Sequence, residues 1–118
     1  MISSLVFQQM SMKAGDLRGF QMEWAVPSDM PYLQGHFPGR PVFPAVAIVD
    51  ASLYALRLKF PEAVLKSVET AKFLKLIEPG QPLQIEFVLQ DDEAWRVEWK
   101  DEKGETLFAT LRLRLGTK

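Results

Sequence analysis

Cysteine is absent from the 118-residue sequence, and histidine occurs only once, as His36. Without thiols the chain can form no disulfide and has no thiolate nucleophile, and zinc patterns that need cysteine are excluded. One histidine also leaves too few ligands for a typical metal centre, so we expect no metal. A chain without disulfides fits a reducing compartment, and we expect this protein in the cytoplasm.

Long apolar runs and an excess of one charge are absent as well. No segment has the roughly eighteen uninterrupted apolar residues of a membrane span, and the N-terminus lacks the basic and apolar regions of a signal peptide. Fourteen basic residues oppose fifteen acidic ones, so no electropositive footprint indicates nucleic acid. With 47% hydrophobic residues, the sequence predicts one domain over residues 1–118.

Residues 36–50 read HFPGRPVFPAVAIVD and change character at Pro44. Prolines fix φ and remove hydrogen-bond donors, so residues 36–44 should form a stiff, extended loop that carries His36. Pro44 can open a helix, which the composition predicts from Ala45 to about Leu58. That helix is apolar around most of its circumference and should be surrounded by protein. Asp50 must then either face solvent or lie in an apolar site where it keeps its proton.

Alternating apolar residues predict strands on both sides of this helix. The strands are expected over residues 4–13, 20–26, 64–77, 83–89, 95–99 and 107–115, with turns at residues 14–16 and 79–82. Such spacing is typical of an antiparallel sheet. One apolar helix and one antiparallel sheet predict an α+β fold in which the sheet curls around the helix, and the three tryptophans should be core or interface residues.

The segment from His36 to Asp50 resembles the active-site signature of the hotdog-fold 3-hydroxyacyl-acyl-carrier-protein dehydratases. That signature reads His-Phe-x-Gly-x-Pro-x-x-Pro-Gly-x-x-x-x-Glu or Asp, and here the histidine and the acid are likewise fourteen positions apart. Residues 71–75 and 79–83 are similar to the strand and turn that follow the central helix in this family. The length is similar to that of the small thioester dehydratases of aryl polyene clusters. The resemblance implies the hotdog fold and removal of water from a 3-hydroxyacyl thioester without a cofactor.

The resemblance also implies roles for the residues of the signature. His36 would be the base that takes the C2 proton, and Asp50 the acid that protonates the departing hydroxyl. Ala45 replaces the family glycine whose N–H donates to the thioester oxygen. An alanine keeps this N–H, although its methyl group could crowd the thioester.

Four further residues are expected to bind substrate: Phe37, Gly39, Val46 and Tyr54. Tyr54 follows the acid by four positions, where these dehydratases commonly have glutamine. The replacements at Ala45 and Tyr54 indicate either an altered substrate shape or a loss of activity.

Three functions therefore stay open. The first is a dehydratase acting on a thioester of acyl carrier protein or coenzyme A. The second is a thioesterase of the same fold, which needs only an acid and the helix N-terminus. The third is a non-catalytic subunit that binds acyl carrier protein.

The resemblance also implies a homodimer joined edge to edge through its sheets. Asp50 should lie about 7.5 Å beyond Ala45 along the helix, and His36 is tied to a short, stiff segment before Pro44. The two side chains of one protomer therefore converge poorly on adjacent substrate carbons. In the family they come from different subunits, so we expect each site to combine His36 of one chain with Asp50 of the other.

Overall fold

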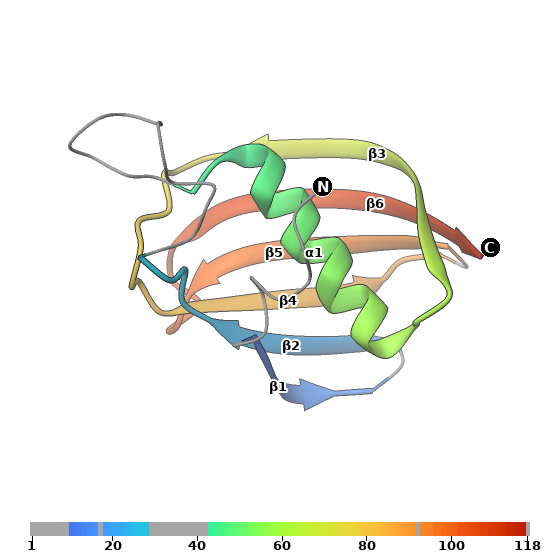
Figure 1. Cartoon of the computed structure of the whole chain (residues 1–118), viewed down its shortest axis with the longest axis horizontal. Coiled ribbons are helices and arrows are strands. Elements are labelled where there is room, and N and C mark those ends of the chain that lie inside the picture. Colours follow the sequence, from blue (N-terminus) through green and yellow to red (C-terminus); the bar gives the residue numbers. More distant parts are fainter. Residues whose placement is uncertain (1–9, 17, 29–42, 92, 118) are drawn as a thin grey trace.

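The computed structural model describes residues 10–16, 18–28, 43–91 and 93–117. Within these residues the elements follow one another as β1 (Ser11–Gly15), β2 (Gly19–Trp24), α1 (Ala45–Lys59), β3 (Ala63–Phe73), β4 (Leu83–Leu89), β5 (Ala94–Asp101) and β6 (Leu107–Thr117) (Figure 1). The strands form one antiparallel sheet in the order β1-β2-β4-β5-β6-β3. The predicted helix over 45–58 is thus confirmed to within one residue.

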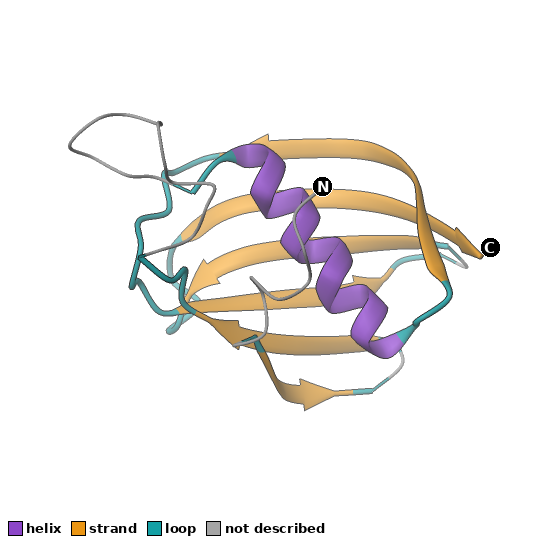
Figure 2. Ribbon diagram, in the orientation of Figure 1, coloured by secondary structure: helices purple, strands orange, loops and turns teal. Residues whose placement is uncertain are grey.

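The sheet curls around α1, which lies along its concave face (Figures 1 and 2). The helix turns a buried face of mostly small residues toward the sheet: Ala47, Ile48, Ala51, Ser52, Ala55 and Leu56. These small side chains let the helix lie close to large sheet residues such as Phe87 and Trp99, which are fully buried. The α+β arrangement predicted from the patterning is therefore the one observed.

The three tryptophans are core residues, as predicted, with exposed fractions of 4% for Trp24, 4% for Trp95 and 0% for Trp99. The indole N–H of Trp99 donates to the Ser52 hydroxyl at 2.9 Å, and that hydroxyl donates to the Ile48 carbonyl at 2.7 Å. Buried polar atoms require such partners. This chain of hydrogen bonds ties α1 to β5 inside the apolar core.

The strand predicted over 64–77 ends earlier than expected, at Phe73. The backbone N–H groups of Leu74 and Lys75 both donate to the Phe108 carbonyl, at 2.8 and 3.2 Å, so the regular ladder with β6 stops there. Two register shifts, between Leu65 and Ser67 and between Val68 and Thr70, explain the imperfect alternation of this segment.

The turn predicted over 14–16 lies slightly later in the structure. Gly15 still belongs to β1, and the turn begins at Asp16, whose Oδ1 accepts N–H bonds from Arg18 at 2.8 Å and Gly19 at 3.2 Å. Gly15 has a φ of 128°, and a side chain there would collide with the Gly19 carbonyl. The strand predicted over 4–13 falls mostly outside the described residues, and the described strand is Ser11–Gly15.

Strands β1 and β3 form the two edges of the sheet. Most of β3 is exposed, including the apolar side chains of Val68 and Phe73, at 41% and 44%. An edge strand with exposed apolar side chains offers a surface for pairing with another strand. Among the described residues, no helix has the length and apolar character needed to cross a membrane.

Candidate active site

The N-terminus of α1 presents backbone donors at the surface that have no backbone partner among the described residues. Pro44 is the N-cap in an extended conformation, and its carbonyl accepts N–H bonds from Ala47 and Ile48 at 3.0 and 3.2 Å. The N–H groups of Ala45 and Val46 precede the first intrahelical bonds, and both residues are exposed. The first turn holds no acidic residue, so no carboxylate of its own offsets the positive end of the helix dipole. This end can therefore stabilise negative charge on an approaching oxygen.

Val46, Asp50 and Tyr54 follow one another at intervals of four residues along α1, which places them on one face of the helix. Val46 is 62% exposed, whereas Asp50 and Tyr54 are half-buried. Asp50 lies about 7.5 Å along the axis from Ala45. The structure thus places three of the predicted site residues on one face of α1 and Ala45 at the start of the helix. The half-buried Asp50 is intermediate between the solvent-exposed and the apolar environments expected for it.

The remaining predicted site residues, His36, Phe37 and Gly39, lie outside the described residues. Both ends of the segment that contains them are nevertheless anchored. The N–H of Phe43 donates to the Ile77 carbonyl at 2.8 Å, and the N–H of Gly80 donates to the Val26 carbonyl at 2.8 Å. The segment between Val26 and Phe43 therefore starts and finishes beside the β3–β4 connection.

The side chain of Phe43 fixes the position of the backbone just before α1. Its side chain is 3% exposed and packs against Trp24 and Trp99, with ring centroids 5.4 and 6.0 Å apart. Sequence reasoning did not identify Phe43 or Ile77 as positioning residues. The only local signal was the Pro-Gly-Gln-Pro turn, where Gly80 has a φ of 81°.

Exposed apolar side chains lie near the start of α1. Figure 1 places this end of the helix next to the end of β3, and α1 and β3 are in contact. Val46, Leu74 and Leu76 are each more than half exposed. Two exposed lysines, Lys72 and Lys75, are close to the leucines in sequence.

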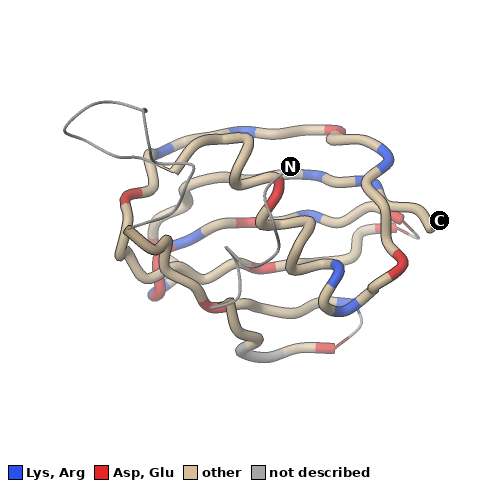
Figure 3. The backbone as a smooth tube through the Cα atoms, in the orientation of Figure 1, with Lys and Arg blue, Asp and Glu red and all other residues tan. Residues whose placement is uncertain are grey.

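Charged residues of both signs are spread over the strands of the sheet (Figure 3). Arg112 and Arg114 donate to Glu69 at 2.8 and 2.7 Å, and hydrogen bonds from Arg114 and then Arg112 lower the pKa of the Glu69 carboxyl. Asp91 also accepts from both arginines, at 3.0 and 3.4 Å. These mixed charges hold the sheet surface together and form no basic patch. The described residues include no group of three or more side chains arranged to hold a metal ion.

Comparison with known proteins places this geometry in a family context. The family model ApeI-like, described as ApeI dehydratase, matches residues 11–112. The 3-hydroxyacyl-acyl-carrier-protein dehydratase FabZ of Pelotomaculum thermopropionicum is 38% identical over 73 residues, which cover 55% of this chain and 52% of that protein. FabZ of Chloroflexus aggregans is 33% identical over 76 residues, covering 58% of this chain and 53% of that protein. The matched region thus spans about half the length of these curated relatives.

Solved structures show the same fold. The dehydratase heterocomplex ApeI:P from Xenorhabdus doucetiae superposes with a TM-score of 0.78 at 18% identity, covering 88% of this chain and 92% of that one. A hypothetical thioesterase with coenzyme A from Streptococcus pneumoniae gives a TM-score of 0.68 at 13% identity, covering 98% and 92%. The predicted hotdog fold is confirmed.

Proposed function

Because the chain belongs to the ApeI-like dehydratase family, we propose that it removes water from a 3-hydroxyacyl thioester to give the trans-2-enoyl thioester. The reaction would serve fatty-acid or polyene-type biosynthesis in the cytoplasm. The observation that carries this proposal is the exposed N-terminus of α1, with donors at Ala45 and Val46 and a half-buried Asp50 on the same helix. The curated relatives are named for substrates on acyl carrier protein, which is the carrier we favour over coenzyme A.

The proposed mechanism is an acid–base elimination. His36 takes the C2 proton, the electrons of that C–H bond form the C2=C3 double bond, and the C3–O bond breaks. Protonated Asp50 gives its proton to the departing hydroxyl, which leaves as water. The thioester oxygen gains negative charge meanwhile, and the N–H of Ala45 at the positive end of α1 stabilises it. Proton transfer from His36 back to Asp50 through solvent resets the site.

Substrate binding is assigned to four other residues. Val46 and Tyr54 share the helix face of Asp50, so their side chains would line the acyl group next to the acid. Phe37 and Gly39 belong to the same signature as His36 and are proposed to hold the thioester from the loop side. No cofactor enters this scheme.

We further propose that the working unit is a homodimer joined along β3. Three observations support this β3–β3 interface. β3 is an edge strand, its side chains Val68 and Phe73 are exposed, and the exposed Leu74 and Leu76 follow it in the chain. Antiparallel pairing of two β3 strands would extend the sheet and cover the open β3 edge of each protomer. Each of the two sites would then combine His36 of one protomer with Asp50 of the other.

A product assay separates the dehydratase from its two alternatives. The purified protein is given a 3-hydroxyacyl thioester, and enoyl absorbance and free thiol are followed separately. Enoyl formation without thiol supports the proposal, and His36→Ala should reduce it by about a hundredfold or more. Thiol release would instead identify a thioesterase, for which the fold shared with the Streptococcus pneumoniae protein is the supporting observation. Neither product would favour the non-catalytic subunit.

A further inference from the structure

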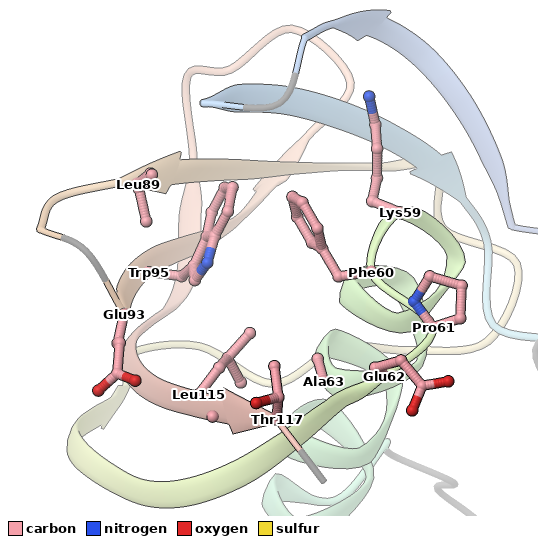
Figure 4. Close-up of a pocket in the computed structure, with 11 residues that line it drawn as sticks. Lys59, Phe60, Pro61, Glu62, Ala63, Leu89, Glu93, Trp95, Leu115 and Thr117 are labelled. Carbon is pink, nitrogen blue, oxygen red and sulfur yellow. The ribbon is translucent and has the colours of Figure 1, made fainter.

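A cavity of about 470 Å³ lies at the C-terminal end of α1, against the ends of β4, β5 and β6 (Figure 4). Its walls are mainly apolar and come from Phe60 beside the helix end, Leu89 of β4, Trp95 of β5 and Leu115 of β6. The rings of Phe60 and Trp95 contact each other, with centroids 5.5 Å apart and planes inclined by 47°. The volume falls within the roughly 300–1,000 Å³ range of small-molecule sites, which are also mostly apolar.

The charged side chains of this cavity stand at its rim. Figure 4 shows the ends of Lys59, Glu62 and Glu93 directed away from the space between the apolar walls. The Lys59 ammonium lies 5.1 Å from the Phe20 ring centroid and 3.4 Å from the Asp16 carbonyl oxygen. The Glu93 carboxylate is 3.3 Å from the Lys66 ammonium. Lys59 and Glu93 thus already have partners within the chain, so the cavity favours a ligand without charge.

The cavity is separate from the candidate active site. Ala45 and Lys59 are the two ends of a 15-residue helix, about 21 Å apart along its axis. Ala51, Ala55, Leu56 and Trp99 lie between those ends and have no exposed surface. Fully buried side chains of the core therefore lie between the cavity and the start of the helix. None of Ala45, Val46, Asp50 or Tyr54 is among the residues that line the cavity.

We propose that this cavity is a second binding site, which takes a neutral aromatic small molecule. The half-buried ring of Phe60 and the small exposed part of Trp95, 4% of that residue, supply the aromatic surface. Aromatic groups prefer offset or edge-to-face contacts with such rings. This site is distinct from the proposed dehydratase chemistry, because none of the described residues assigned to that reaction lines the cavity.

Indole is a suitable probe, since it is neutral, planar and aromatic. In nitrogen-labelled protein, the three tryptophans provide three indole N–H signals that can be followed during a titration with unlabelled indole. Trp95 lines the cavity, whereas the Trp99 N–H is bonded to Ser52 inside the core and serves as an internal reference. A saturable shift of the Trp95 signal, with the Trp99 signal unmoved, is the expected result. No saturable shift of Trp95, or an equal shift of both signals, would overturn the proposal.

Variants at the cavity wall sharpen the test. Leu89→Glu places a charge on the apolar wall and should weaken indole binding by about tenfold or more, whereas Leu89→Met should keep it within about threefold. Leu58→Glu is the matched control, because Leu58 is 51% exposed on α1 outside the cavity, and it should leave binding unchanged. If Leu89→Glu does not fold, Thr117→Phe replaces it by filling the cavity from the exposed end of β6. Unchanged indole affinity in the folded wall variant would contradict the assignment.

Discussion

At the scale of single residues, the hydroxyl of Ser52 has an importance that its size does not suggest. It is the one polar side chain in the buried set of the described residues, and it accepts the Trp99 indole N–H. Ser52→Ala leaves that N–H unpaired in the core, which should lower the free energy of unfolding by about 1–3 kcal/mol. Urea denaturation measures the change, with Ser11→Ala at an exposed position of β1 as the control. Equal stability of the two variants would show that the hydrogen bond contributes little.

Ala45 is the residue at which this chain departs from the glycine of the family signature. Ala45→Gly should raise the dehydration rate on straight-chain substrates if the alanine methyl group crowds the thioester. Ala45 is the first residue of α1, so the substitution should cost less than the roughly 0.5–1 kcal/mol of a glycine in a helix interior. Steady-state rates over several chain lengths measure the effect. A lower or unchanged rate on all of them would rule out crowding.

At the scale of elements, local patterns predicted most of what the structure contains. The apolar composition of α1 and the alternation in β2, β4, β5 and β6 gave their positions to within a few residues, because each pattern matches the period of its element. The early end of β3 was not predictable, since it depends on bonds from Leu74 and Lys75 to the distant Phe108 carbonyl.

The candidate site likewise contains features that local sequence patterns could predict and features that they could not. Ala45, Val46, Asp50 and Tyr54 fall on α1 as the helical period requires, so their common placement could be predicted. The anchor of Phe43 on Ile77 joins residues far apart in sequence, and no local pattern contains it. The positions of His36, Phe37 and Gly39 stay predictions.

The pairing of β3 with β6 is reinforced by Glu69, whose pKa is lowered by its hydrogen bonds to Arg114 and Arg112. A carboxyl with a lowered pKa stabilises the fold above its unfolded pKa, and this contribution is lost as the pH falls through the folded value. Glu69→Gln should therefore lower the Tm by roughly a few degrees near neutral pH, and the difference should shrink in acid, below the ordinary value of 4.5. Thermal unfolding across this range checks it, with exposed Glu105→Gln as the control. A constant difference at every pH would contradict the ion-pair explanation.

At the scale of the whole molecule, we propose that a second chain completes the site. Asp50 lies on the helix, β3 is an exposed edge strand among the described residues, and the exposed side chains of Leu74 and Leu76 follow that strand. Pairing along β3 would bury these apolar groups and bring the helix of one protomer toward the loop of the other. Stability, assembly and activity would then all depend on the interface between the two β3 strands.

Subunit complementation tests this central claim most directly. His36→Ala and Asp50→Asn homodimers should each be inactive in the enoyl-absorbance assay. Random exchange of the two variants gives about half mixed dimers, each with one intact and one doubly mutated site, so activity should recover to about a quarter of wild type. Native mass spectrometry confirms that mixed dimers have formed. Mixed dimers without recovered activity would contradict a site shared between His36 of one chain and Asp50 of its partner.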